Sequence, residues 1–437
     1  MSDVTQVNPK TSPPVNRLEL TIAHKQGDTW PVYAQHRRAG SQISSRIEGE
    51  LRLPESWEKL LERYARTGDR LAYGRTLGQG LFQDEVDVAM RETLYGEERL
   101  RLLLVVDDPE LRSLRWELLC ARESRSGDWS PLVHNPWVFF SRYVLSESRR
   151  RFQIGQKELR TLIAIAGASS DDKFGLQAFD EEALIEVFEQ AFQGFDHTIL
   201  REATLEALLD GLQTREYSVL QIIAHARQAQ RSLEPGLFLR DEKDGMAVIK
   251  GDSLIKRLGS LTKLPDLAFL VAAGGRENWT KDDVPMNALA YGLVHDLGMP
   301  FALALSDAVT FKSAEILFRE FYKGLRMHGQ VDRALSEATV HVAAVEDAAP
   351  ICALYSRVEN SQLLEERPAE SAVRLGQPDI VIYNDDMVVG GDVASDKQMI
   401  DTRQLASLRR AMVESFTYDE LRDLCFVELD IRFESLD

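Results

Sequence analysis

Short apolar runs alternate with amphipathic helical stretches along residues 159–327, and this alternation constrains the fold more than any other feature of the chain. The short runs predict buried strands, whereas apolar residues at every third or fourth position predict helices that bury one face. Strands connected through helices form parallel pairs, because the helix carries the chain back across the sheet. We therefore expect an α/β fold with a mostly parallel sheet, helices on both faces, and ligand or catalytic groups at the carboxyl ends of the strands.

The elements expected in this part of the chain follow one another in strict succession, within a domain expected at 151–364. The expected strands cover residues 159–166, 197–201, 218–224, 267–272 and 301–305. The expected helices cover residues 180–192, 204–212, 252–261, 286–297 and 312–327.

The region before this domain has a different character. Residues 1–16 are polar and contain prolines, so we expect them to be disordered. Residues 17–150 begin with alternating apolar and polar positions, which are typical of antiparallel strands. Helical stripes follow at 56–66 and 81–94, so this region is expected to be of the α+β type.

The C-terminal part is expected to hold a linker and a small helical segment. Residues 365–401 place Pro, Gly and Asp between short β-like pieces such as DIVIY, which predicts an extended linker with weak β character. Residues 402–437 have a helical pattern and contain a capping box from Thr417 to Glu420. Two short helices bury little surface alone, so we expect them to dock on a partner, on the main body or on helices missing from this chain.

Charge and cysteine usage exclude several classes of function. A formal net charge of -18 repels phosphate backbones and anionic lipids, so we expect neither nucleic acid nor membrane as a partner. No apolar stretch approaches the length that spans a bilayer. Cys120, Cys352 and Cys425 are far apart and form no CxxC pair, which fits a reducing cytoplasm without disulfides. We expect no cofactor and no metal site.

Two of the expected strands end in residues that suggest chemistry. The run YSVLQIIAH stops on His225, and the run DLAFLVAAGG stops on Ala273 and two glycines. A histidine beside a thiol can generate the attacking thiolate, and small residues leave backbone N–H groups free to bind an oxyanion. Two neighbouring strand ends would supply this geometry, but the second one lacks the thiol. On its own, His225 would be interpreted as a strand-end histidine bonded to a neighbouring carbonyl.

Several longer segments occur in an order that is typical of one family. They are LGQGLF, LRLLLVVDDPELRSLRWELL, LRTLIAIAG, ATLEALLDGLQTREYSVLQIIAHA, AEILFREFYKGLRMHGQVDRALSEA and PICALYSRV. Together, over residues 77–364, they resemble the CHAT family of caspase-like cysteine peptidases, in the clan of caspases, metacaspases and separase. The resemblance implies a caspase-like sheet. Arg115 stands where the family usually has a proline before the tryptophan.

The resemblance implies roles for residues at both strand ends. It makes His225 the general base and places the nucleophile, a cysteine in the family, at Ala273. It implies that the backbone N–H groups of Ala226 and Gly274 bind the oxyanion. However, Ala224 and Ala226 replace the family's glycines on either side of the histidine, and an alanine N–H serves only where the backbone angles suit a residue with Cβ.

The resemblance also implies partners. Ser306 and Asp307 would lie near the pocket for the P1 side chain of a protein or peptide substrate, where an acidic residue favours a basic side chain. Residues 408–437 resemble the opening of the effector-associated domain, a small death-like helical bundle of bacterial conflict systems, and the chain stops inside it. This implies adaptor or effector proteins as partners of the C-terminal helices.

Three explanations remain open for Ala273. The chain is a natural pseudopeptidase, carries an engineered substitution of the catalytic cysteine, or has its nucleophile elsewhere. The third is disfavoured because all three cysteines fall in other family segments. The replaced glycines favour natural loss, whereas the retained His225 favours an engineered change. We expect a bacterial caspase-like effector of antiphage defence or programmed cell death that is inactive as written, with a pseudopeptidase scaffold or regulator as the alternative.

Overall fold

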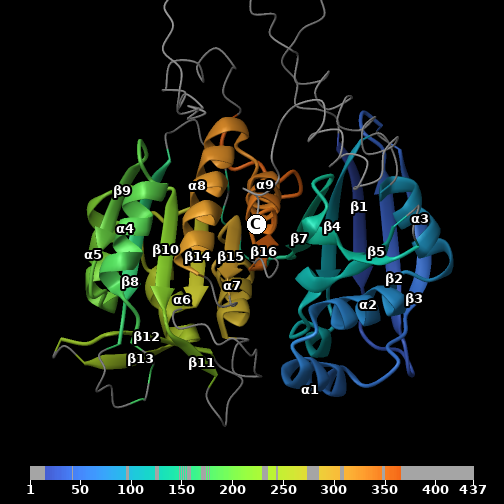
Figure 1. Cartoon of the computed structure of the whole chain (residues 1–437), viewed down its shortest axis with the longest axis horizontal. Helices are drawn as coiled ribbons and strands as arrows, with labels where there is room; N and C mark the ends of the chain where they lie inside the picture. The colour runs from blue at the N-terminus through green and yellow to red at the C-terminus, as the bar shows by residue number, and fades with distance from the viewer. Residues whose placement is uncertain are drawn as a thin grey trace, which may run out of the picture. The chain divides into compact units, whose positions relative to one another are not determined.

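One large sheet organises the part of the chain that the structure describes (Figure 1). The computed structural model describes residues 15–365, except 42, 95–97, 124–126, 147, 149, 151, 153, 155–158, 169–173, 175, 177, 229–234, 243–244, 273–284, 306–309 and 347–349. The strands of this sheet are β1 (Val15–Ile22), β2 (Trp30–Arg37), β3 (Ser44–Leu51), β4 (Arg99–Val106), β7 (Val138–Tyr143), β8 (Arg160–Ala166), β9 (Asp196–Leu200), β10 (Val219–Ala224), β14 (Leu267–Ala272), β15 (Phe301–Leu305) and β16 (Cys352–Ser356). Their order across the sheet is β3-β2-β1-β4-β7-β16-β15-β14-β10-β8-β9.

The strands predicted from the alternating pattern form a parallel set. β9, β8, β10, β14 and β15 are neighbours in the sheet, and each pair among them is parallel. All residues of β10 and β15 are buried, as expected for strands that are covered on both faces. The predicted α/β class with a mostly parallel sheet is confirmed.

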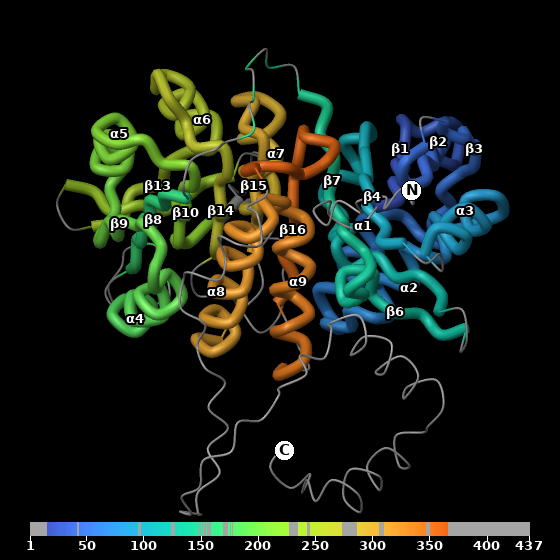
Figure 2. The backbone as a smooth tube through the Cα atoms, turned by 90° about the horizontal axis from the view of Figure 1, so that it is seen from above, coloured from blue at the N-terminus to red at the C-terminus, as the bar shows by residue number. Residues whose placement is uncertain are grey.

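Helices cover both faces of this parallel set, as Figure 2 shows. On one face lie α4 (Glu181–Ala191), α8 (Phe311–His328) and α9 (Val331–Ala343), and on the other lie α5 (Leu205–Thr214), α6 (Gly251–Gly259) and α7 (Pro285–His295). Alternate strand residues pack into the two helical layers, because successive side chains point to opposite faces. Val219 and Ile223 of β10 pack with the first layer, whereas Leu220 and Ile222 pack with the second.

The N-terminal region extends the same sheet. β1 pairs antiparallel with β2 and β2 antiparallel with β3, as the alternating pattern predicts, and β1 also pairs in parallel with β4. β1 begins at Val15, inside the segment expected to be disordered, so that expectation is wrong for Val15 and Asn16. The remaining elements of the region are the helices α1 (Trp57–Thr67), α2 (Arg70–Leu81) and α3 (Asp84–Leu94), the short 3₁₀ helices η1 (Pro109–Leu111), η2 (Trp116–Leu118) and η3 (Leu132–His134), and the strands β5 (Cys120–Arg122) and β6 (Trp129–Pro131).

The helix expected at 81–94 begins three residues later than predicted, and Leu81 belongs to the preceding helix. α2 ends at Leu81, and α3 begins only at Asp84, whose φ of 45° lies in the left-handed region. α2 itself was not expected, because its glycines weaken a helical pattern. A Cβ at Gly74 would collide with the carbonyl oxygen of Leu118, and one at Gly78 with that of Cys120. The glycines therefore let α2 lie directly against the backbone that leads into β5.

A second, three-stranded sheet was also not expected. It consists of β11 (Ala226–Gln228), β12 (Pro235–Arg240) and β13 (Met246–Lys250), all antiparallel, and it follows β10 directly. No helix in the described residues is long and apolar enough to cross a membrane.

Two buried ion pairs connect elements that are distant in sequence. Nε of Arg142 on β7 lies 2.5 Å from Oε1 of Glu117 on η2, and its Nη2 lies 2.8 Å from Oε2. Arg101 on β4 binds Asp332 on α9 with an Nε–Oδ2 distance of 2.5 Å. The second pair fastens the N-terminal part of the sheet to the helical layer of the parallel set. Removing one partner of a buried ion pair leaves the other charge buried without compensation, which strongly destabilises the folded state.

We expect Glu117→Gln to lower the free energy of unfolding by about 3–5 kcal/mol, because Arg142 would remain buried without its counter-charge. The control is Glu315→Gln, which removes one of the two carboxylates that pair with Arg319 on the surface of α8 and should change the free energy by about 0–1 kcal/mol. Urea unfolding followed by tryptophan fluorescence measures both values. Equal effects of the two substitutions would show that the Glu117 pair is not a structural anchor.

Candidate active site

The two strand ends singled out in the sequence lie side by side in the sheet. β10 and β14 are adjacent and parallel, and their register places Ala224 opposite Ala272. On the other side of β10, Ala224 is opposite Ala166, the last residue of β8. Three alanines thus form one row at the carboxyl edge of the sheet. His225 directly follows the central alanine, and position 273 directly follows Ala272.

His225 is held on several sides. It is 7% exposed, and its ring packs against that of Phe179, with 6.0 Å between the centroids. Its carbonyl oxygen accepts a hydrogen bond of 2.9 Å from the backbone N–H of Phe238 on β12. The ring therefore has an aromatic neighbour, and the backbone at His225 is fixed to β12.

An apolar cluster includes Phe238, whose backbone N–H binds the carbonyl oxygen of His225. Ala168, Leu176, Phe238 and Met246 form a small buried cluster, and the ring of Phe174 packs edge-on against Phe238 at 5.2 Å. The cluster joins the segment after β8 to the three-stranded sheet.

One backbone donor at this edge is already occupied. The N–H of Gly167, directly after β8, donates to Oε1 of Glu181 in the first turn of α4 at 2.7 Å. A Cβ at Gly167 would collide with that carboxylate, so the contact requires glycine. The N–H groups that follow β10 and β14 are therefore better candidates to bind a substrate oxygen.

The remaining predicted site residues divide into two groups. Ala226 begins β11 and pairs with Leu237 of β12, and its φ is not among the positive values of the described residues, so a Cβ there causes no backbone strain. Ala273, Gly274, Ser306 and Asp307 lie outside the described residues. The last two directly follow β15, which is the other neighbour of β14.

The described cysteines are poorly placed to replace a missing nucleophile. Cys120 is fully buried on β5, and burial raises the pKa of its thiol to about 12. Cys352 begins β16 at the same edge as His225, but β15 and β14 lie between β16 and β10. Three strand spacings amount to about 14 Å, which is beyond the reach of proton transfer. Cys425 lies outside the described residues.

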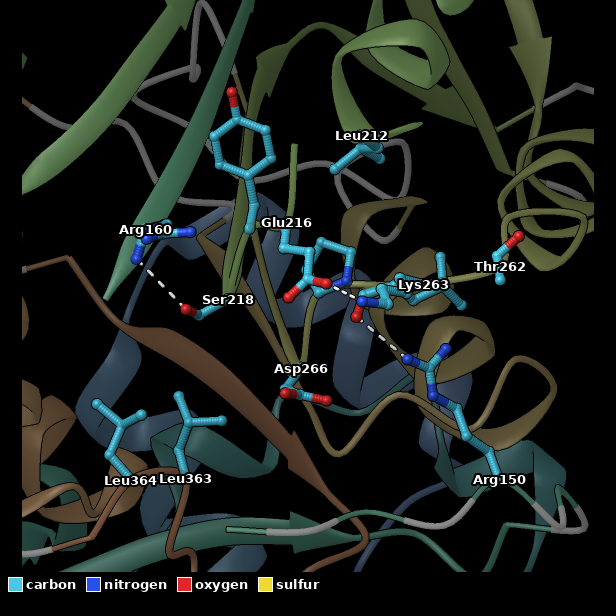
Figure 3. Close-up of a pocket in the computed structure, with 13 residues that line it drawn as sticks. Arg150, Arg160, Leu212, Glu216, Ser218, Thr262, Lys263, Asp266, Leu363 and Leu364 are labelled. Atoms are coloured by element: carbon cyan, nitrogen blue, oxygen red, sulfur yellow. Dashed lines mark hydrogen bonds and ion pairs between the residues drawn. The ribbon is translucent and has the colours of Figure 1, made fainter. Parts of the chain in front are cut away.

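The sequence pattern singled out His225 but did not predict which residues lie around it. The apolar stripe of α4 gave no sign that Phe179, just before this helix, would face the imidazole. The sequence pattern also did not predict a pocket of about 300 Å³ at the amino ends of the parallel strands (Figure 3). Within the described residues, no group of three or more His, Cys, Asp or Glu side chains is placed to hold a metal ion.

The comparison with protein families agrees with the resemblance seen in the sequence. The family model of the CHAT domain matches residues 71–368. No curated protein matches the chain. Among solved structures, the complex of Porphyromonas gingivalis RgpB pro- and mature domains matches at 12% identity and a TM-score of 0.38, covering 70% of this chain and 76% of that chain. A mutant of the PilB minor pilin from Streptococcus sanguinis matches at 7% identity and a TM-score of 0.25, covering 74% of this chain and 79% of that chain.

We expect the native chain to protect both described thiols from alkylation. Cys120 has a raised thiol pKa and Cys352 is only 5% exposed, so iodoacetamide at pH 7.5 should leave both unlabelled for hours, and urea should release both. Peptide mapping by mass spectrometry gives the label at each site. Rapid native labelling of Cys352 would show instead that this edge of the sheet holds an accessible thiol.

Proposed function

The chain belongs to the CHAT domain family of caspase-like cysteine peptidases, and we propose that it is an endopeptidase effector whose nucleophile position is occupied by Ala273. The observation that carries this proposal is the pairing of Ala224 with Ala272. It sets His225 and position 273 directly after the ends of adjacent parallel strands, which are about 4.8 Å apart. Side chains leaving two such ends can reach hydrogen-bond distance of each other.

The reaction we propose needs a cysteine at position 273. The His225 imidazole would take the thiol proton, and the thiolate would attack the peptide carbonyl. The C–N bond then breaks, the amine leaves with the proton from His225, and water hydrolyses the thioester. The methyl side chain of Ala273 has no lone pair to form this bond, so the chain as written binds substrate at most.

The oxyanion donors we propose are the backbone N–H groups of Ala226 and Gly274. The unstrained backbone at Ala226 supports its part, since the alanine in place of the family's glycine requires no left-handed conformation. The hydrogen bond from Gly167 to Glu181 also supports this choice, because it commits the first N–H after β8 to another partner.

We propose Ser306 and Asp307 as the residues that select the substrate side chain. They follow β15, and β15 is adjacent to the strand that leads to position 273. The carboxylate of Asp307 would favour Arg or Lys at P1. A protein or peptide is therefore the proposed substrate.

The cellular role we propose is that of a cytoplasmic effector in a bacterial antiphage or cell-death system. The supports are the family itself and the resemblance of residues 408–437 to an effector-associated domain, through which adaptor proteins would bind. The two described cysteines are free thiols, which is compatible with a reducing compartment.

A natural pseudopeptidase that acts as a scaffold or regulator is the second candidate. The observation that favours it is the replacement of the family's two glycines by Ala224 and Ala226, since an engineered change of the nucleophile alone would leave them in place.

The test of the first candidate is the substitution Ala273→Cys in the full chain. We expect it to cleave peptides with Arg or Lys at P1, and His225→Ala in the same background should lower kcat/KM by about 100- to 10,000-fold. The matched control is Ala272→Cys, which places a thiol one residue earlier, on the opposite face of the strand, and should stay inactive.

The same assay, run with peptides carrying Asp at P1 and with co-purified partners, separates the two candidates. A folded Ala273→Cys variant without any cleavage would rule out the endopeptidase and leave the pseudopeptidase. Equal activity of the Ala272→Cys and Ala273→Cys variants would reject the proposed pair of positions.

A further inference from the structure

A pocket of about 300 Å³ lies at the amino ends of the same strands that carry the candidate active site (Figure 3). Its lining includes Arg160 at the start of β8, Ser218 just before β10, and Asp266 just before β14. We call it the amino-edge pocket. Its volume is in the range of pockets that hold small organic ligands.

The amino-edge pocket is separate from the candidate active site. β10 spans Val219–Ala224, with the pocket before its first residue and His225 after its last. At about 3.3 Å per residue, the two ends of this strand are about 20 Å apart. A molecule in the pocket therefore cannot be the substrate bound beside His225.

Cationic side chains outnumber carboxylates by one among the residues that line this pocket. Arg150, Arg160 and Lys263 line it, against the carboxylates of Glu216 and Asp266. This excess of cations is local, since the whole chain carries a formal net charge of -18. The pocket therefore offers cationic groups to an anion on a chain that is acidic as a whole.

The cations of the pocket are held by interactions that an anion could share or replace. Nη2 of Arg150 donates to the neutral carbonyl of Leu264 at 3.1 Å. Nε of Arg160 lies 3.4 Å from Asp196, a carboxylate that also pairs with Arg215.

The remaining cation, Lys263, pairs with Glu216, and the two side chains are 67% and 43% exposed. Exposed pairs of this kind contribute little to stability, so the lysine can turn towards a stronger anion at small cost.

Apolar side chains complete the wall. Leu212, Leu264, Leu363 and Leu364 line the pocket from three separate segments. In Figure 3, Leu363 and Leu364 lie on the far side of Asp266 from Arg150. A ligand with an anionic group at one end and a carbon skeleton at the other would match both kinds of surface.

We propose that the amino-edge pocket binds a small organic anion, through a carboxylate or phosphate group held by Arg150, Arg160 and Lys263. The hydroxyl groups of Ser218 and Thr262 are further hydrogen-bonding groups in the lining. Binding at this edge needs no residue of the candidate active site, so it is independent of whether position 273 carries a thiol.

The test is titration of the full chain, with Ala273 unchanged, by isothermal titration calorimetry. Phenyl phosphate and benzoate are the two probes. The probe that binds more tightly shows whether the pocket prefers a phosphate or a carboxylate group. Sodium chloride at matched ionic strength is the blank. We expect saturable binding of at least one probe and a concentration-dependent rise in Tm, because the ligand binds only the folded chain.

Opposite substitutions within one ion pair give the decisive comparison. Lys263→Gln should weaken binding roughly three- to tenfold, whereas Glu216→Gln should strengthen it, because it removes the competing carboxylate and frees the lysine. If the pair had only a structural role, both substitutions would act in the same direction. Arg319→Gln, in an exposed pair on α8, is the control and should leave binding unchanged.

Arg150→Gln supplies a second, independent variant and should weaken binding about tenfold or more, because a charge-assisted hydrogen bond is lost. The proposal is overturned if neither probe shows saturable binding beyond the sodium chloride blank. It is also overturned if the Lys263 and Glu216 variants shift affinity in the same direction. Either result would leave the proposed peptidase site untouched, because the titration involves neither His225 nor position 273.

Discussion

Burial of the central strands on both faces is the constraint on which the rest of the structure depends. The backbone groups of β10 and β14 are removed from water, so they must pair with neighbouring strands along their whole length. Parallel pairing satisfies them and requires a crossover between successive strands. All strands of the parallel set therefore have their carboxyl ends on the same side of the sheet. His225 follows the carboxyl end of β10 and so lies on the side where the chain also leaves β14.

The sequence predicted the parts of the fold that depend on local patterns. The bounds of β14 and β15 agree with the expected strands, because both are continuous apolar runs between turn residues. α2 was missed because its glycines serve close packing against β5, and packing partners are not visible in a local pattern. The insertion of β16 between β15 and β7 depends on pairing across long stretches of chain, which no local pattern encodes.

For the candidate site, too, the sequence predicted the local features but not the contacts between distant segments. The end of a strand on His225 follows from the apolar run before it. The row formed by Ala166, Ala224 and Ala272 depends instead on register between three strands, and the packing of Phe179 against the imidazole depends on how the segment before α4 folds back. Family resemblance implied the role proposed for the histidine, whereas the structure shows its neighbours.

The place of β16 in the sheet has a consequence for how the protein is made. β16 runs between β7 and β15 and pairs with both, yet it is synthesised roughly 200 residues after β7. Until it leaves the ribosome, β7 and β15 each present an unpaired edge, and such edges attract other chains. The sheet is therefore completed only when the last strand of the described residues has been synthesised.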